Sequence, residues 1–245
     1  MRTFGLIAAA LAAAILVTAA PAAAAPITFN FATDPGDGPP GVRRITGPIT
    51  YGPGLVVQGF FQGEGFGPGD LYRRNDSEDH GFGVCAPDDI DAGACEDGET
   101  GQGAWNELDN AEYAEFIQLT LPDGYFWVSV GLSSLDTDER GVLWADDNAN
   151  PSDGFTMPVC TFEAFGPYSC VVMGGGSVEP TLLIPEAFQS VPYLVFEPFD
   201  WTMGGSDDND FLVRSATIDA IPEPASLVLL GSGLLGLAAA RRRRT

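Results

Sequence analysis

The chain contains one histidine, His80, and no lysine. His80 is therefore the first residue to consider as a catalytic base. A Ser-His-Asp hydrolase would have to use His80, which lies in a polar run that we expect to be an exposed loop. The sequence has no G-x-S-x-G nucleophile motif. The lack of lysine excludes Schiff-base chemistry and a phosphate-binding P-loop. Catalytic zinc usually takes two or three histidines. We therefore expect no enzyme built around His80.

Carboxylates are the remaining candidates for chemistry. A glycoside hydrolase or lyase needs only two well-placed acids, but the sequence singles out no pair. Calcium is better supported, because Ca²⁺ prefers six to eight oxygen ligands and several loops are rich in aspartate and asparagine. These residues are candidate calcium ligands at the loop ends of a β-sandwich: Asp136, Asp138, Asp146, Asn148, Asp207, Asp208 and Asp210.

The loop that starts at Asp146 resembles the opening of an EF-hand calcium loop only in part. Asp146, Asn148 and Asn150 have the right spacing, but Pro151 replaces the required glycine and Met157 replaces the bidentate glutamate. Calcium held by several loops and solvated turns without metal therefore both stay open. No other cofactor is expected.

The four tryptophans are candidate platforms for stacking of sugar rings: Trp105, Trp127, Trp144 and Trp201. Alternation along residues 125–135 places Trp127 on the face opposite Phe126 and Val128, which predicts exposure or contact with a second sheet. A place in the core is the alternative for each of them.

The four cysteines form two pairs with a spacing of ten positions: Cys85, Cys95, Cys160 and Cys170. Three disulfide connectivities are possible, and pairing within each local pair requires the least rearrangement of the chain. The C-x₂-C spacing of a Cys₄ zinc site is absent. An even number of cysteines in an exported chain favours disulfides.

The elements that must position these residues are predicted to be strands. Short apolar or alternating runs recur between turn residues, whereas a sustained helical period is absent from the middle of the chain. We predict strands at residues 27–32, 45–51, 55–61, 115–121, 125–135, 142–145, 156–165, 168–173, 181–184, 191–196 and 211–218. Residues 60–69 are predicted to be a glycine-rich loop or edge strand, and residues 105–113 a helical turn. The pattern indicates an all-β fold, an antiparallel β-sandwich of the jelly-roll-like kind.

The charge of the chain excludes some partners. The net charge is −23, and six basic residues against 33 acidic ones remain between the terminal segments. A surface with this much negative charge repels nucleic acid and anionic lipid headgroups. Neither is therefore an expected partner of the domain.

The C-terminal residues 221–245 have the order of a membrane-targeting signal. Pro222, Glu223 and Pro224 precede sixteen uncharged residues, 225–240, which are followed by Arg241, Arg242, Arg243 and Arg244. A helix over 225–240 is about 24 Å long, close enough to the roughly 30 Å hydrocarbon core to span it if the arginines snorkel. The arginines after the span place the C-terminal end in the cytoplasm. A buried C-terminal helix is the alternative.

The order of these features resembles the PEP-CTERM sorting signal of exported bacterial proteins. The resemblance covers about a tenth of the chain, and it implies an exosortase as the processing enzyme, with association with extracellular polysaccharide or biofilm matrix. It also implies an inner-membrane anchor that is transient, with the cell surface or the extracellular space as the final location.

The N-terminal residues agree with export. Arg2, an apolar run and the alanines up to Ala25 are typical of a secretory signal peptide, and we predict residues 1–24 as this leader. Residues 25–220 then form one exported domain between two terminal helices. We expect a non-enzymatic surface or matrix protein; a carbohydrate- or calcium-binding module is the alternative.

Overall fold

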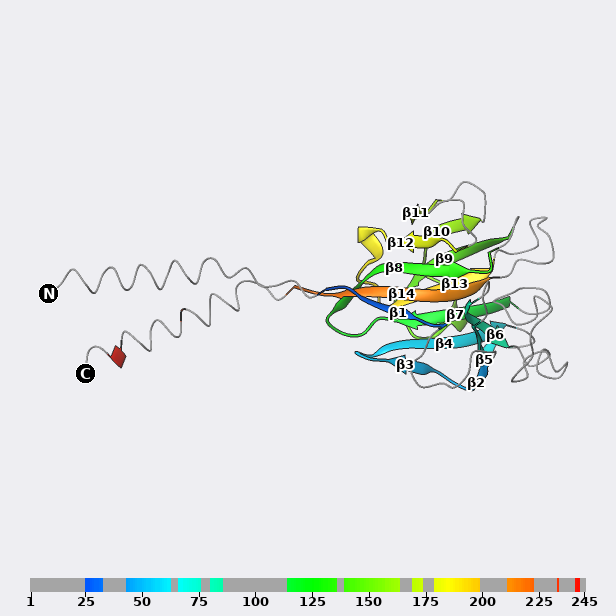
Figure 1. Cartoon of the computed structure of the whole chain (residues 1–245), viewed down its shortest axis with the longest axis horizontal. Coiled ribbons are helices and arrows are strands. Elements are labelled where there is room, and N and C mark those ends of the chain that lie inside the picture. Colours follow the sequence, from blue (N-terminus) through cyan, green and yellow to red (C-terminus); the bar gives the residue numbers. More distant parts are fainter. Residues whose placement is uncertain are drawn as a thin grey trace. The chain divides into compact units, whose positions relative to one another are not determined.

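The computed structural model describes residues 25–32, 43–62, 66–75, 80–85, 114–135, 139–163, 169–173, 179–198 and 211–222, together with 233 and 241–242. The chain divides into the domain Pro26–Asp219 and a second unit made of the terminal segments Met1–Ala25 and Ala220–Thr245. The domain is described by itself (Figure 1).

The described residues of the domain form strands and two short 3-10 helices. The strands are β1 (Ile27–Asn30), β2 (Arg43–Ile45), β3 (Ile49–Tyr51), β4 (Leu55–Gln62), β5 (Phe66–Asn75), β6 (His80–Cys85), β7 (Ala114–Thr120), β8 (Tyr125–Ser133), β9 (Arg140–Asp146), β10 (Met157–Glu163), β11 (Val171–Met173), β12 (Thr181–Leu183), β13 (Tyr193–Pro198) and β14 (Leu212–Ala220). The 3-10 helices are η2 (Pro151–Asp153) and η3 (Glu186–Phe188).

The strands join in one sheet, so the predicted all-β antiparallel fold is confirmed. The sheet has the order β10-β9-β13-β7-β4-β5-β6-β14-β8-β12-β11, and β1, β2 and β3 add to β14, β5 and β4. The predicted sandwich would have two separate sheets, but here the strands form one half-barrel. The two parts of the sheet are joined because β5 pairs with strands of both. Its first part, Phe66 to Gly69, pairs with β4, and its second part, Asp70 to Asn75, pairs with β6.

The core fills the concave side of this half-barrel. It includes Leu55 of β4, Ile117 of β7, Leu194 of β13 and Ile218 of β14, all fully buried. Trp127 is also in this core, with 0 % of its surface exposed, and its Nε1–H donates to the Val191 carbonyl oxygen at 2.9 Å. Of the alternatives left open for Trp127, the place in the core is therefore confirmed and exposure is wrong.

The predicted alternation failed in β8 because its apolar pattern changes phase. Trp127, Val130 and Leu132 all belong to the core, and the step from the first to the second is three residues rather than two. Phe126 and Val128, which alternation placed on the face opposite Trp127, are only half-buried.

Sequence patterns predicted a loop or an edge strand for the first part of β5, within residues 60–69, and they missed the rest of β5 and all of β6. At Gly69 an added Cβ would lie 2.7 Å from Val84 Cγ1, and at Gly81 it would lie 2.7 Å from the Val213 carbonyl oxygen. These glycines therefore permit close contact between neighbouring strands rather than a turn. His80 is the first residue of β6, not a residue of an exposed loop.

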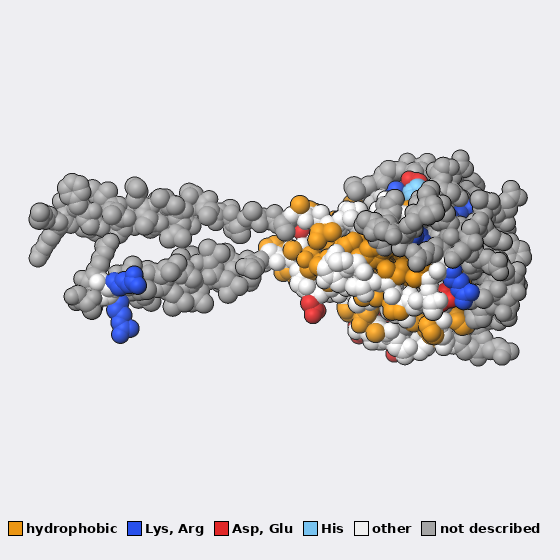
Figure 2. Space-filling model, turned by 60° about the horizontal axis from the view of Figure 1, so that its bottom comes forward, with side chains coloured by type: hydrophobic (Ala, Val, Ile, Leu, Met, Phe, Trp, Pro, Cys, Tyr) orange, Lys and Arg blue, Asp and Glu red, His pale blue; other side chains and the backbone are white. Residues whose placement is uncertain are grey.

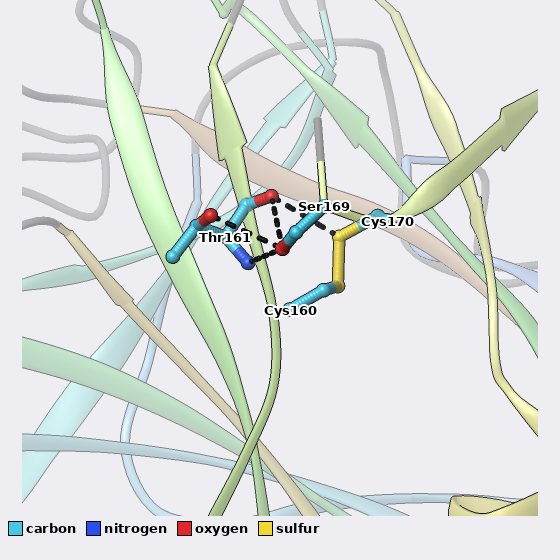
Figure 3. The surroundings of a disulfide bond; sticks show 4 residues. All are labelled: Cys160, Thr161, Ser169 and Cys170. Carbon is cyan, nitrogen blue, oxygen red and sulfur yellow. Dashed lines mark hydrogen bonds between the residues drawn. A yellow bond between two sulfur atoms is a disulfide. The ribbon is translucent and has the colours of Figure 1, made fainter. Parts of the chain in front are cut away.

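A disulfide links the two strands at the ends of the sheet order. Cys160 of β10 is bonded to Cys170, which directly precedes β11, with a Cα–Cα distance of 5.1 Å. Ser169 N–H donates to the Thr161 carbonyl oxygen at 3.2 Å beside it, and Thr161 N–H donates to Ser169 Oγ at 2.8 Å (Figure 3). The predicted local pairing is thus confirmed for Cys160 and Cys170. Cys85 is also disulfide-bonded, and Cys95 lies outside the described residues.

Replacing Cys160 and Cys170 together by serine is expected to lower the free energy of unfolding by about 2–3 kcal/mol, because the bond closes a short loop in the unfolded chain. Guanidinium unfolding followed by far-UV circular dichroism measures this loss. An unfolding midpoint of the double variant equal to that of the native protein would contradict the prediction.

The terminal helices and the helical turn expected at residues 105–113 cannot be compared with the structure. The leader, residues 1–24, lies outside the described residues, as does the apolar run 225–240 apart from Gly233. Within the described part of the chain, no helix has both the length and the apolar character needed to cross a bilayer.

Candidate functional site

The end of β14 leads directly into the predicted sorting signal. β1 pairs with β14 in antiparallel register, with Ile27 opposite Ile218 and Thr28 opposite Thr217. The Oγ1 atoms of Thr28 and Thr217 are 3.0 Å apart, and Ile218 is fully buried. Pro222 cannot donate a hydrogen bond to continue the ladder. The chain therefore passes from a paired strand to an exposed segment within two residues.

The exposed segment begins with Ile221, which has 54 % of its surface accessible, and Pro222 is exposed as well. Of the other residues predicted for the signal, Arg241 and Arg242 are exposed, whereas Glu223, Pro224, Arg243 and Arg244 lie outside the described residues. Within the domain, the β1 register continued by one residue places Pro26 level with Asp219 near the end of β14.

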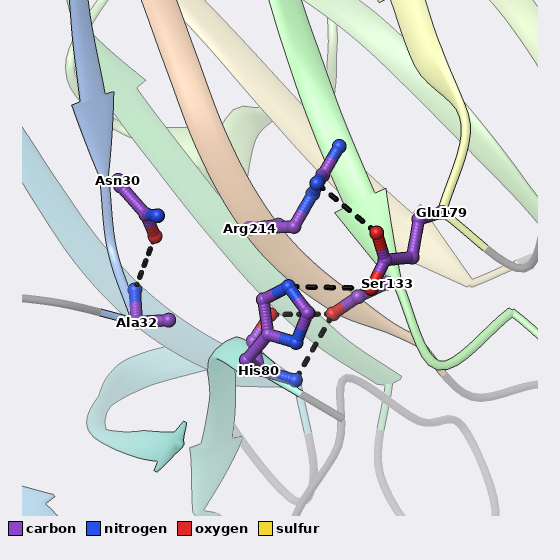
Figure 4. Close-up of polar contacts among 6 residues, drawn as sticks. All are labelled: Asn30, Ala32, His80, Ser133, Glu179 and Arg214. Atoms are coloured by element: carbon purple, nitrogen blue, oxygen red, sulfur yellow. Dashed lines mark hydrogen bonds and ion pairs between the residues drawn. The ribbon is translucent and has the colours of Figure 1, made fainter. Parts of the chain in front are cut away.

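His80 belongs to a polar cluster at the opposite end of β14 (Figure 4). His80 Nε2 lies 3.3 Å from Glu179 Oε1, and Arg214 Nη1 donates to Glu179 Oε2 at 3.2 Å. Ser133 Oγ donates to the His80 carbonyl oxygen and accepts the His80 N–H. Because Ser133 bonds to the backbone of His80, its hydroxyl is not arranged to pass a proton to the imidazole. The cluster joins β6, β8 and β14, and it does not have the geometry of a Ser-His-Asp triad.

Two of the candidate calcium ligands, Asp146 and Asn148, are described. Asp146 is 1 % exposed, and its Oδ1 accepts hydrogen bonds from Asp147 N–H at 2.8 Å and Thr156 Oγ1–H at 2.7 Å. Its Oδ2 is buried without a hydrogen-bond partner. Asn148 Oδ1 instead accepts from Asn150 N–H at 2.7 Å. Asp146 thus has a free ligand atom, whereas the Asn148 oxygen is engaged within the loop.

The remaining candidates cannot be placed around Asp146. Five of them lie outside the described residues: Asp136, Asp138, Asp207, Asp208 and Asp210. Within the described ranges, no group of three or more histidine, cysteine, aspartate or glutamate side chains is arranged to hold a metal ion.

A second apolar cluster lies on the convex face of the sheet, across β4, β7, β13 and β9. We call it the convex-face cluster, and it consists of Phe60, Phe66, Ala114, Phe116, Trp144, Phe155 and Val195. The rings of Trp144 and Phe155 are 5.5 Å apart, and those of Phe116 and Phe155 are 5.2 Å apart. Trp144 is half-buried, and its Nε1–H donates to Glu197 Oε2 at 2.6 Å. Of the four tryptophans, Trp144 is therefore the described one that reaches the surface; Trp105 and Trp201 lie outside the described residues.

Gln118 is a polar residue of this face that the sequence analysis did not select. It lies opposite Gln58 of β4 and Val195 of β13, is 3 % exposed, and its Nε2 has no hydrogen-bond partner. Alternation with Ile117 and Leu119 was the available signal, because it places Gln118 on the face away from the core. The burial of that face by Phe155 could not be inferred from the pattern.

Comparison with known families finds a match to the PEP-CTERM protein-sorting motif over residues 220–244. No curated protein and no solved structure matches the chain. The matched segment begins at the last residue of β14 and includes Pro222, Glu223, Pro224 and the four arginines. Residues 220–244 are thus a PEP-CTERM protein-sorting motif, and the chain is an exported protein of the kind that exosortase sorts.

Proposed function

We propose that residues 25–220 form a non-enzymatic extracellular domain, which is exported by its leader and held at the inner membrane by residues 225–240. Exosortase processes the chain at or near Pro222-Glu223-Pro224, after which the domain is found at the cell surface or in the matrix. The observation that carries this proposal is the sorting motif directly after a paired strand. An exposed Ile221-Pro222 segment supports it, because an enzyme that acts on a peptide backbone needs an accessible extended chain.

Replacing Pro222, Glu223 and Pro224 by alanine is expected to abolish C-terminal processing, because the recognised residues are removed while the apolar run remains. Intact mass of the protein isolated from cells that contain exosortase measures whether the C-terminal segment is retained. Replacing Pro158 and Pro185 by alanine is a matched control, since both prolines are exposed in the domain. Normal processing of the triple-alanine variant would contradict the proposal.

Association with extracellular polysaccharide is the finer part of the proposal. It rests on the resemblance of the sorting signal, and the half-exposed Trp144 beside Phe155 and Glu197 is compatible with contact to sugar rings. Affinity electrophoresis in gels that contain the cell's own polysaccharide tests it. A mobility equal to that in the plain gel would contradict this association.

The second candidate function is calcium binding at Asp146. The specific observation is the buried Asp146 Oδ2 without a partner. A carboxylate oxygen removed from water and left without a partner is unfavourable, and a bound cation would offset this loss. Carboxylate oxygen is the ligand type that Ca²⁺ prefers.

Calcium is expected to raise the melting temperature of the native protein relative to protein in EGTA. At one hundred times the dissociation constant, the stabilisation is about 2.7 kcal/mol, which corresponds to roughly 5–10 °C for a domain of this size. The Asp146→Asn variant should show no calcium response, whereas Asp153→Asn, an exposed residue of the same loop, should respond like the native protein. Equal melting temperatures of the native protein with calcium and with EGTA would refute calcium binding.

A further inference from the structure

Only a short linker separates the folded domain from the apolar run. β14 ends at Ala220, and residues 221–224 are followed directly by the uncharged run 225–240. Four fully extended residues span about 14 Å. A small protein domain is about 30 Å across. The enzyme that processes the sorting motif must therefore meet the folded domain while it binds the linker.

The domain does not easily release more chain to lengthen this linker. β14 lies between β8 on one side and β6 and β1 on the other. Ala216 and Ile218 of β14 are fully buried in the core. Separation of the end of β14 from its neighbours would expose these side chains, and burial of a large aliphatic side chain contributes about 1.5–3 kcal/mol. The close approach is thus a property of the folded state.

The surface nearest the linker is formed by turns at the end of the domain where β14 finishes, which we call the junction end. Arg214, at the start of β14, contacts Glu179 close to the end of β8, so the start of β8 lies near the end of β14. The turn 121–124 before β8 and the 3-10 helix η3 are therefore at the junction end, since Trp127 N–H donates to the Gln189 carbonyl oxygen. Figure 1 shows η3 and the end of β14 on the same side of the domain.

Charge is distributed unequally between the two ends of the domain. Asp123 in the turn before β8 and Glu186 in η3 are exposed at the junction end. The described arginines of the domain lie elsewhere. Two are in β2 and two in the second part of β5, while Arg140 is the first residue of β9 and Arg214 the third residue of β14. In Figure 2 the blue side chains visible on the domain lie on its right-hand part. The described residues thus make the junction end acidic.

We propose that the junction end is a contact surface for the enzyme that processes the sorting motif, and that the facing surface of that enzyme is cationic. The inference rests on the proposed function. The short linker makes the contact unavoidable. Asp123 and Glu186 give the domain side of this contact a negative charge. The alternative occupant, the lipid surface, fits less well, because anionic headgroups repel an acidic surface.

Charge substitutions in the full-length chain test this contact. Processing of Asp123→Arg/Glu186→Arg is expected to be roughly tenfold slower than that of the native protein, since reversed charges oppose the encounter. Asp123→Asn raises the net charge by one unit at the junction end, and Gln62→Arg does so at an exposed site far from it. The first should slow processing and the second should not. The fraction processed over time is measured by intact mass in cells that contain exosortase, and retention of the disulfides in the same mass confirms folding.

A longer linker provides the decisive comparison. Insertion of ten glycine and serine residues between Ala220 and Ile221 separates the domain from the enzyme, so charge-reversed and native domains should then be processed at equal rates. The proposal is overturned if charge reversal has no effect with the native linker, if it has the same effect with the long linker, or if no long-linker chain is processed. Failure of the proposed function is a different result, namely normal processing without Pro222-Glu223-Pro224.

Discussion

The Trp127→Ala variant is expected to lose about 3–5 kcal/mol of the free energy of unfolding, the largest effect among the substitutions considered for the domain. Trp127 has no exposed surface and packs in the main core. Removal of the indole leaves a cavity that the neighbouring strands can fill only in part. Equilibrium unfolding in guanidinium, followed by far-UV circular dichroism, measures the loss without dependence on tryptophan fluorescence.

Trp127→Phe separates packing from hydrogen bonding. Phenylalanine fills much of the same volume, but it leaves the Val191 carbonyl oxygen without its donor. A loss of about 1–3 kcal/mol is expected for a buried acceptor that loses its partner. If Trp127→Ala were no more destabilising than Trp127→Phe, the assignment of Trp127 to the core would be wrong.

The Gly81→Ala variant is expected to lose about 3 kcal/mol, from overpacking together with backbone strain. Gly81 has a φ of +149°, and an added Cβ would lie 2.7 Å from the carbonyl oxygen and 2.9 Å from the carbonyl carbon of Val213. These atoms are backbone and cannot rotate away. β6 meets β14 at this point, with Phe82 opposite Val213, so the substitution weakens the joint between the two strands.

Gly124→Ala is the matched control, because Gly124 has a φ of +82° but open space where a Cβ would be. It should show the backbone strain alone, about 1 kcal/mol. The difference between the two variants in the same unfolding assay measures the steric part. Equal losses would show that the contact between β6 and β14 is not as close as described.

Sequence patterns predicted the elements that alternate regularly and missed those that depend on distant partners. β7 was found because Ile117 and Leu119 alternate with polar residues within the strand predicted at 115–121. The first part of β5 was predicted to be a loop or an edge strand and β6 was missed, because Gly69 and Gly81 are required by contacts with Val84 of β6 and Val213 of β14. A local pattern does not contain that requirement.

The candidate site divides in a similar way. The sorting motif is a local signal, because its residues are contiguous, so it could be identified from residues 221–245 alone. The free oxygen of Asp146 and the buried Gln118 could not be identified, since both depend on side chains brought together by the sheet. The spacing of Asp146, Asn148 and Asn150 indicated a loop rich in ligands, but the Asn148 oxygen is bonded to the loop backbone.

The bond between Cys160 and Cys170 has a consequence for where the protein can safely reach its native state. β10 and β11 are the two ends of the strand order among the described residues, and strands at the ends of a sheet tend to add strands from other copies of a chain. The crosslink holds these two ends near each other only where thiols are oxidised. Copies retained in a reducing compartment therefore lack this crosslink, and export to an oxidising compartment also protects the chain against self-association.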